Sequence, residues 1–254
     1  MSGSFMDTKA RPILRWVWQR CQAGRNRFRS AEAVFASIYR KQKWGSGPGR
    51  FCSGGGSSQA ENAAAYLRLI EEESLARGFA GRAWLDLGCG DFQIGSRLRP
   101  LAGSYTAVDV VGELIAHHRA HYRGLPVEFV HADISGGAAL PKADVVFVRQ
   151  VLQHLSNGQI ARALQRLRDY PLVYLTEHHP SAGKLRRPNA DMVQGSGIRL
   201  DGGSGVCFAE PPFSIPPGEL ELVLEVPVVL AGVAGDLGVL KTWRYTPGAA
   251  AWTP

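Results

Sequence analysis

Short apolar runs alternate with helical patterns through the middle of the chain. The runs have the length and composition of buried β-strands and cover residues 83–87, 105–109, 127–134, 143–150 and 171–176. Between the last two runs, Ile160, Leu164 and Leu167 recur at the spacing of one helical face. Strands that alternate with helices in this way predict an α/β domain with a mostly parallel sheet.

Helical patterns also stand ahead of the first strand. Apolar residues recur at helical spacing over 13–21, 34–39 and 63–75. A stretch rich in glycine and serine, residues 44–58, separates the second pattern from the third. Such a stretch is either a flexible linker or a loop that closes over a ligand.

The first strand runs into a glycine-rich turn. After the apolar residues of 83–87, Gly88 and Gly90 permit backbone angles and a close approach of ligand that a Cβ atom would block. Such a turn after a buried strand predicts a nucleotide-like cofactor. Phe92 stands where a dinucleotide fingerprint needs its third glycine, which argues against NAD as the ligand. The alternative is a tight turn whose glycines serve geometry alone.

Acidic residues end the next two strands. Asp109 follows the glycines by roughly 20 residues, the offset at which a carboxylate accepts both ribose hydroxyls of a nucleotide. Asp133 could accept the exocyclic amine of adenine while Ile134 packs on the ring. The alternative for both acids is to cap the helix that follows.

The glycine turn and the segments after it resemble motif I and the following elements of class I S-adenosylmethionine (SAM) dependent methyltransferases, with a bacterial subgroup acting on small molecules or glycans favoured. The resemblance covers about residues 44–246 and is strongest between Trp84 and Leu155. It implies a doubly wound, Rossmann-like, seven-stranded sheet that is mostly parallel, with an antiparallel last strand and helices on both faces. The strand-like runs 220–229 and 238–245 would close that sheet.

The same resemblance implies SAM as the cofactor and S-adenosylhomocysteine (SAH) as its product. It favours a cofactor-closing role for the segment 44–80, with 1–43 as a basic helical arm, 81–246 as the methyltransferase core and 247–254 as a tail. The residues expected to bind the cofactor stand at the ends of the first four strands: Asp86, Gly88, Cys89, Gly90, Asp109, Val110, Asp133, Ile134, Arg149 and Gln150.

Three histidines are candidates for a general base, which is needed if the methyl acceptor carries a proton that must leave. His178 and His179 directly follow the fifth predicted strand, and Glu177 could orient one of the rings. Their alternative role is to cap the strand and bond to loop carbonyls. His154 follows the fourth strand and could instead line the cofactor pocket.

A long segment rich in glycine and proline, residues 177–218, is the candidate substrate lid. It starts at the carboxyl end of a strand, where open α/β sheets bind ligands. Polar and aromatic residues of this segment could recognise and wall an acceptor: Glu177, Asp191, Arg199, Phe208 and Phe213. Ordinary loop chemistry explains them equally well.

Charge and composition narrow the possible partners. The net charge of +7 is concentrated in residues 1–43 and the remainder is close to neutral, so only the arm could bind nucleic-acid phosphates. No apolar stretch approaches the roughly 18 residues of a membrane span. The scattered cysteines form no Cys-x-x-Cys pair, which fits a reducing, cytoplasmic compartment. His117, His118 and His121 are expected on the solvated face of a helix, and without a third spaced ligand we expect no metal there.

These observations predict a SAM-dependent methyltransferase that acts on a small polar metabolite, with an oxygen of a sugar or secondary metabolite favoured. Two alternatives stay open: an RNA methyltransferase anchored by the basic arm, and a non-catalytic SAM-binding partner protein. The neutral core argues against RNA, and the intact set Gly88, Gly90, Asp109 and Asp133 argues against a non-catalytic protein. The oligomeric state stays open.

Overall fold

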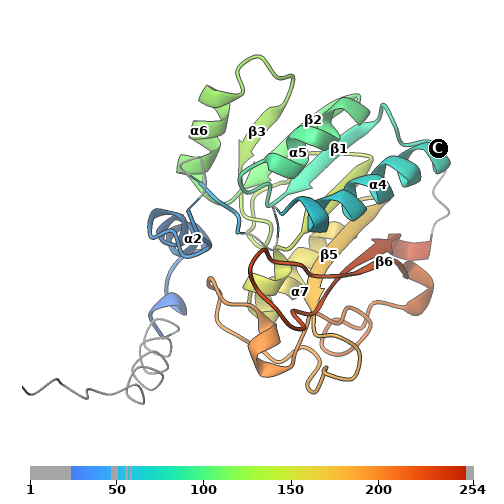
Figure 1. The fold of residues 1–254 in the computed structure, drawn as a ribbon. Helices are drawn as coiled ribbons and strands as arrows, with labels where there is room; N and C mark the ends of the chain where they lie inside the picture. The colour runs from blue at the N-terminus through green and yellow to red at the C-terminus, as the bar shows by residue number, and fades with distance from the viewer. Residues whose placement is uncertain (1–23, 47–50, 55–56, 58, 250–254) are drawn as a thin grey trace, which may run out of the picture.

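A seven-stranded sheet forms the centre of the protein, in the order β3-β2-β1-β4-β5-β7-β6 (Figure 1). The computed structural model describes residues 24–46, 51–54, 57 and 59–249, so the helix predicted over 13–21 lies outside the described residues. The parallel strands are Ala83–Leu87 (β1), Ser104–Asp109 (β2), Glu128–His131 (β3), Val145–Arg149 (β4) and Val173–His179 (β5).

Two further strands complete the sheet beyond β5. β7 (Val239–Tyr245) pairs antiparallel with β5, and β6 (Leu220–Pro227) pairs antiparallel with β7. β6 therefore runs in the same direction as β5, and β7 runs against both of its neighbours. These pairings confirm the predicted doubly wound sheet, mostly parallel and closed by an antiparallel last strand.

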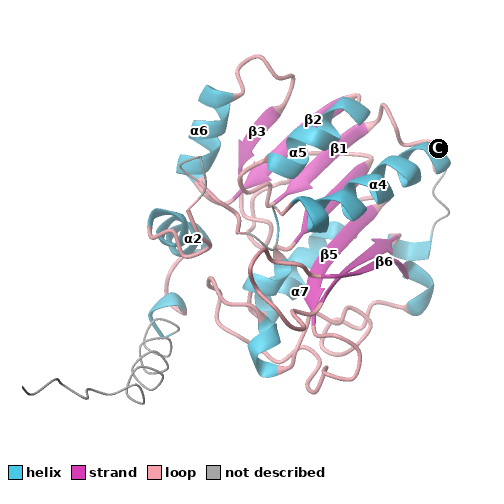
Figure 2. Ribbon diagram, viewed as in Figure 1, coloured by secondary structure: helices cyan, strands magenta, loops and turns pink. Residues whose placement is uncertain are grey.

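Helices cover both faces of the sheet (Figure 2). They are Ala60–Ala76 (α4), Gln93–Leu98 (α5), Gly112–His121 (α6) and Asn157–Leu167 (α7). A further helix, Ala31–Arg40 (α2), lies next to α6 (Figure 1). Short 3₁₀ turns cover Arg99–Leu101, Leu152–His154, Arg199–Gly202, Pro217–Glu219 and Pro247–Ala249. None of the helices in the described ranges is long and apolar enough to cross a membrane.

The strand order decides which face each helix covers. From β1 the chain moves outward to β2 and β3, whereas from β4 it moves the other way to β5. Because parallel connections are right-handed, α5 and α6 cover one face and α7 covers the opposite face. The direction therefore reverses between β1 and β4, and the carboxyl ends of strands at such a point are where open α/β sheets bind ligands.

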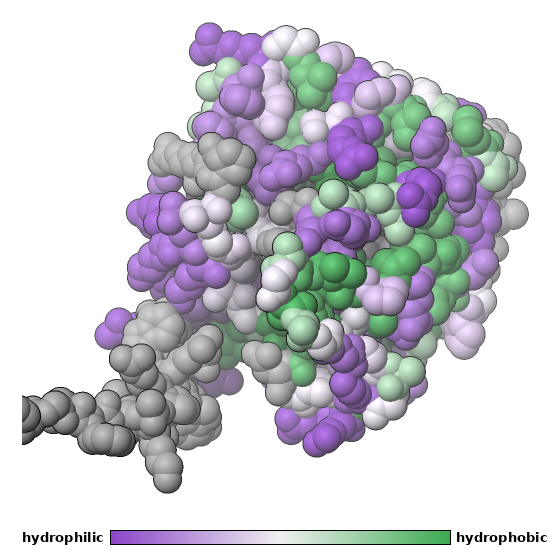
Figure 3. Space-filling view, viewed as in Figure 1, coloured by the Kyte–Doolittle hydropathy of each residue, from purple (hydrophilic) through white to green (hydrophobic). Residues whose placement is uncertain are grey.

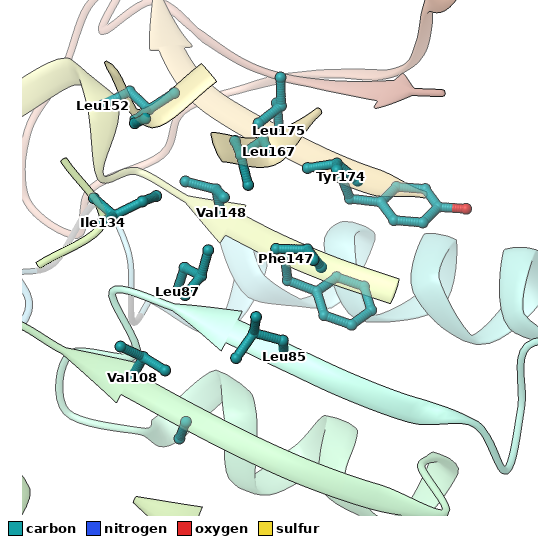
Figure 4. Packing of buried hydrophobic residues seen from close by; sticks show 14 of the residues in the cluster. Leu85, Leu87, Val108, Ile134, Phe147, Val148, Leu152, Leu167, Tyr174 and Leu175 are labelled. Carbon is teal, nitrogen blue, oxygen red and sulfur yellow. The ribbon is translucent and has the colours of Figure 1, made fainter. Parts of the chain in front are cut away.

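The centre of the sheet is buried on both faces, which explains the continuous apolar runs in the sequence. Phe147 of β4 stacks on Tyr174 of β5 with ring centroids 5.7 Å apart, close to Leu85 of β1 (Figure 4). Trp84 is fully buried, and its indole Nε1 donates a hydrogen bond to the carbonyl oxygen of Phe79 at 3.0 Å. The buried indole therefore keeps its hydrogen bond, which avoids the cost of an unsatisfied donor.

The ends of β5 and β3 bear on the site, and both differ from their sequence predictions. β5 continues to His179 because its pairing with β7 extends to His179 and Val239. His178 and His179 are therefore the last residues of the strand and do not follow it, and their side chains point to opposite faces. β3 ends earlier than predicted because Asp133 starts a turn, accepting a hydrogen bond from the N–H of Ser135 at 2.7 Å.

Arg166 of α7 fastens the loop that follows β3. Its guanidinium donates hydrogen bonds to a series of loop carbonyls: Asp133, Ile134, Gly136 and Ala138. Arg162, one turn earlier on the same helix, gives a bond from Nε to the carbonyl oxygen of Ser135 at 3.1 Å. The shape of this loop thus depends on Arg166 more than on any other single side chain that contacts it in the described structure.

We expect Arg166→Met to lower the free energy of unfolding by about 1–3 kcal/mol, because several carbonyls lose a charged donor. Arg162→Met is the matched control on the same helix and should cost less than about 1 kcal/mol. Urea denaturation followed by circular dichroism measures both. Equal losses for the two variants would contradict the role given to Arg166.

Candidate active site

A cavity of about 440 Å³ opens at the carboxyl ends of β1, β2, β3 and β4, where the strand order reverses. Every residue that the sequence predicted for cofactor binding lines it: Asp86, Gly88, Cys89, Gly90, Asp109, Val110, Asp133, Ile134, Arg149 and Gln150. These residues come from four strand ends that are far apart in the sequence. The cavity brings them together.

The turn after β1 needs its glycines for two separate reasons. Gly88 has φ +82° and Gly90 has φ +53°, backbone angles that side chains disfavour. A Cβ atom on Gly88 would lie 2.3 Å from Val151 Cγ2, and one on Gly90 would lie 2.3 Å from Ser53 Oγ. The turn is therefore packed against the segment after β4 on one side and against the 51–54 segment on the other.

Asp109 joins the ends of β1 and β2. Its Oδ2 accepts a hydrogen bond from the N–H of Gly90 at 3.1 Å, and its Oδ1 accepts one from the N–H of Val111 at 2.9 Å. Burial raises the pKa of Asp109 to about 6, although these backbone donors oppose the shift. Each oxygen has a second lone pair, so the carboxylate can also accept hydroxyl groups from a ligand in the cavity.

Asp133 and Ile134 form the wall at the end of β3. Asp133 Oδ1 accepts bonds from the N–H of Ser135 at 2.7 Å and from its hydroxyl at 2.9 Å. Both bonds end on the same oxygen, which leaves Oδ2 as an acceptor. Ile134 is 8% exposed and contributes an apolar surface beside it. A flat ring with an amino group suits this pair.

Asp86 and Arg149 place opposite charges at the ends of neighbouring strands. Burial raises the pKa of Asp86 to about 7, while the hydroxyl of Tyr105 donates to its Oδ2 at 3.1 Å and opposes the shift. Arg149 Nη1 donates to Ser57 Oγ at 2.8 Å, and its guanidinium carbon lies 5.1 Å from the ring centre of Tyr66. Burial lowers the pKa of Arg149.

The first described segments, α2 and residues 44–46 and 51–54, form one wall of the cavity, which we call the roof. Phe35 and Tyr39 of α2, Trp44 and Ser53 all line it. Trp44 Nε1 donates to the carbonyl oxygen of Ser196 at 3.2 Å, which ties this segment to the long loop after β5. The predicted Gly/Ser-rich segment thus contributes directly to the cavity in its described part, and the remainder lies outside the described residues.

Ser53 connects the roof to the glycine turn. Its N–H donates to Asp91 Oδ2 at 2.9 Å, and its hydroxyl accepts from the N–H of Asp91 at 2.8 Å. This reciprocal pair holds the roof and the turn in one arrangement. The sequence named the Gly/Ser-rich segment but carried no signal for this particular pairing.

The three candidate bases have different surroundings. His178 and His154 line the cavity, whereas His179 does not. His179 is buried on the other face of the sheet, with its ring centre 4.9 Å from that of Trp243. Burial lowers the pKa of His179 to about 4. The structure therefore separates His179 from the site, because neighbouring residues of a strand face opposite ways.

His178 and His154 also differ in their hydrogen bonds. His178 Nε2 lies 2.6 Å from the carbonyl oxygen of Leu237, so Nε2 carries the proton and Nδ1 is the acceptor. His154 Nδ1 lies 3.0 Å from the carbonyl oxygen of Gly197, and the amide Nε2 of Gln153 lies 3.4 Å from His154 Nε2. Burial lowers the pKa of both histidines, to about 4 for His154.

Glu177 and Arg199 hold a turn and do not line the cavity. The Glu177 carboxylate accepts from the N–H of Leu152 at 2.9 Å and from the N–H of Gln153 at 3.0 Å. Arg199 donates to carbonyls of the same turn, including that of Leu155 at 2.7 Å. Burial raises the pKa of Glu177 to about 8, and the positive charge of Arg199 opposes the shift. Their hydrogen bonds fix the segment that carries His154.

The remaining predicted acceptor residues also lie away from the cavity. Asp191 accepts from the N–H of Asn157 at 2.7 Å, and Phe208 is buried against Trp243 with ring centres 5.1 Å apart. Phe213 packs against the hydrophobic core. Within the predicted lid, the residues that line the cavity are His178, Ser196, Gly197 and Ile198.

His118 supports the glycine turn, which the sequence analysis missed. It was expected on the solvated face of its helix, but it is 2% exposed and its Nε2 lies 2.7 Å from the carbonyl oxygen of Gly90. Its spacing from the buried Leu114 and Ile115 on the same helix was the available signal. Among the described residues, no three metal-ligating side chains gather at one point.

Comparison with known proteins relates the middle of the chain to methyltransferases. Residues 85–170 match the family model of a methyltransferase domain. An uncharacterized methyltransferase of Mycobacterium tuberculosis is 33% identical over 79 residues, and one of Mycobacterium bovis matches equally. The match covers 30% of this chain and 40% of each relative, so the chain spans less than half the length of these relatives.

Solved structures share the fold. The N-methyltransferase NodS from Bradyrhizobium japonicum, in complex with SAH, has a TM-score of 0.53 and 14% identity, and covers 74% of this chain and 88% of that chain. A SAM-dependent methyltransferase from Clostridium acetobutylicum has a TM-score of 0.53 and 13% identity, with 84% and 98% covered. At these identities, the two structures show the fold that they share with this chain.

The pKa of Asp109 predicts a pH-dependent affinity for SAH. The ionised carboxylate is the better acceptor for hydroxyl groups, so the affinity should fall as the pH drops below about 6 and the carboxylate takes up a proton. Asp109→Asn should weaken binding by about 1–3 kcal/mol at neutral pH and remove this step. Asp169→Asn, an exposed acid on another part of the chain, is the control. Calorimetric titration at several pH values measures the effect, and a profile that Asp109→Asn leaves unchanged would refute it.

Proposed function

We propose that the protein transfers the methyl group of SAM to a hydroxyl oxygen of a small polar metabolite. The observation that carries this proposal is the shared cavity. The residues that line it include the cofactor residues at the ends of β1 to β4, the imidazole of His178 and several apolar side chains. A donor and an acceptor bound in the same cavity can be aligned for direct transfer.

The cofactor residues fit SAM. The angles of Gly88 and Gly90 bring backbone close to a ligand, Asp109 offers acceptors for ribose hydroxyls, and Asp133 with Ile134 suits adenine. When bound, SAM supplies a methyl group on a positively charged sulfur, which makes that carbon reactive toward an oxygen lone pair. The residues of the chain hold and orient the two partners.

His178 is the better candidate for the base. Its Nδ1 is left as an acceptor because Nε2–H donates to Leu237, whereas the corresponding acceptor of His154 faces the amide of Gln153. Gln153 also fixes His178 from the backbone side, since its Oε1 accepts from the N–H of His178 at 3.1 Å. An imidazole fixed in this tautomer can take the proton that leaves a hydroxyl group.

Apolar residues also line the cavity. Trp44, Ile198, Val228 and Leu230 line it from three separate segments. The loop between β6 and β7 supplies the last two, and a hydrophobic area lies in the middle of the face where Figure 1 draws this loop (Figure 3). An acceptor with a hydroxyl group on a partly apolar body suits these walls.

One observation favours the RNA alternative. Phe28 is 89% exposed and stands among the exposed residues Arg25, Arg27 and Arg29. An exposed aromatic ring among arginines can stack on an unpaired base. Filter binding of a structured RNA with rising salt tests this candidate: binding that survives physiological salt and is lost in Phe28→Ala would favour RNA as the acceptor, and weak binding that salt abolishes would favour the small metabolite.

Alanine variants of His178 and His179 test the base. His178→Ala should lower the turnover number by about 10²–10⁴-fold while the affinity for SAH stays the same. His179→Ala is the matched control, because it should lower the melting temperature without a comparable loss of turnover. Transfer of a labelled methyl group from SAM into metabolite fractions measures turnover.

The lowered pKa of His178 sets the pH dependence of that turnover. A lowered pKa keeps the imidazole neutral and able to accept a proton below the usual value near 6.5, so turnover should persist to lower pH before it falls. Near wild-type turnover in His178→Ala would remove His178 from the mechanism and leave alignment of donor and acceptor as the main contribution.

A further inference from the structure

Arg149 is a buried cation whose hydrogen bonds are incomplete. It is the last residue of β4 and lines the cavity beside the glycine turn. Its Nη1 is bonded to Ser57 Oγ, but Nε and Nη2 are buried and have no hydrogen-bond partner. Leaving buried donors unpaired costs free energy, and the cost is larger for a charged group.

The two unpaired nitrogens form one edge of the guanidinium group. In arginine, the N–H bonds of Nε and of one terminal nitrogen point the same way, and this edge matches the two oxygens of a carboxylate. The opposite side of the group is fixed by Ser57, and its flat face lies over Tyr66. The contacts that orient the guanidinium therefore leave its carboxylate-binding edge for another partner.

The surrounding charges do not supply that partner. Among the described residues, no carboxylate forms an ion pair with Arg149, and Asp86, Asp91 and Glu177 influence it only through space. Asp86 Oδ2 is bonded to Tyr105, and Glu177 is held by backbone N–H groups. A buried charge without a counterion destabilises the folded chain.

We infer that the Nε and Nη2 edge of Arg149 binds the carboxylate of a ligand in the cavity, and that this carboxylate belongs to the methionyl group of SAM and SAH. The inference rests on the proposed function. Asp86 lines the same cavity on the adjacent strand β1, so a cation and an anion stand together there. A ligand group with both charges, such as an amino-acid group, complements this pair better than a carboxylate alone.

Paired titrations separate this role from a general effect on the pocket. SAH is compared with 5′-methylthioadenosine, which keeps the nucleoside and the sulfur but lacks the amino-acid group. In Arg149→Met the affinity for SAH should fall roughly 10- to 100-fold, as expected for charged hydrogen bonds, while the affinity for 5′-methylthioadenosine stays within about twofold. Arg149→Lys, which keeps the charge but lacks the edge, should recover only part of the loss.

Thermal unfolding of the ligand-free protein gives an independent readout. A structural arginine should destabilise the fold when replaced, whereas replacing an unpaired buried charge by an apolar side chain of similar length should leave the melting temperature unchanged or raise it. Arg97→Met, on the exposed side of α5, is the matched control for the titrations. It should change neither the affinity for SAH nor the affinity for 5′-methylthioadenosine.

Three results would overturn the inference. Equal losses for SAH and 5′-methylthioadenosine would show that Arg149 shapes the pocket in general. An unchanged affinity for SAH in Arg149→Met would exclude the cofactor carboxylate, and if only an acidic acceptor then lost affinity, the carboxylate would belong to the acceptor. Absence of SAH binding in the unaltered protein would overturn the proposed function together with this inference.

Discussion

The carboxylate of Asp109 is the interaction on which the site depends. It is buried, and its oxygens accept from the backbone of Gly90 at the end of β1 and of Val111 at the end of β2. Burial penalises the charge and the backbone donors offset part of that penalty, so the carboxylate is held in place at some cost in stability. The glycine turn cannot shift without breaking one of these bonds.

Other contacts reinforce the same turn from each side. His118 Nε2 contacts the carbonyl oxygen of Gly90, and Ser53 exchanges hydrogen bonds with Asp91. Val151 leaves no space for a side chain at Gly88. The result is a cavity whose backbone is fixed before any ligand arrives, which lowers the entropy that binding must otherwise overcome.

The sequence predicted the parts of this site that follow from local rules. Buried parallel strands are continuous apolar runs, and ligand-binding residues stand at their carboxyl ends, so Gly88, Asp109 and Asp133 could be placed in the cavity from spacing alone. The seven-stranded, mostly parallel sheet with an antiparallel last strand followed from the family resemblance, and the observed pairing agrees with it.

What the sequence missed depends on contacts between distant segments. His179 was grouped with His178 because the end of β5 is set by its pairing with β7, about 60 residues later in the chain. Arg199 was placed in a substrate lid, but its guanidinium finds backbone carbonyls around Leu155, which no spacing rule reveals. The partners of Arg149, from α4 and the Gly/Ser-rich segment, are equally non-local.

The most direct test of the central claim is hydrogen–deuterium exchange of the backbone with and without saturating SAH. If the turn held by Asp109 is the centre of a preformed cofactor site, exchange should slow together in residues 88–92, 109–112, 133–136 and 150–155, and an equal concentration of NAD should leave all four segments unchanged. Saturating SAH that slows exchange in neither 88–92 nor 109–112 would contradict the account.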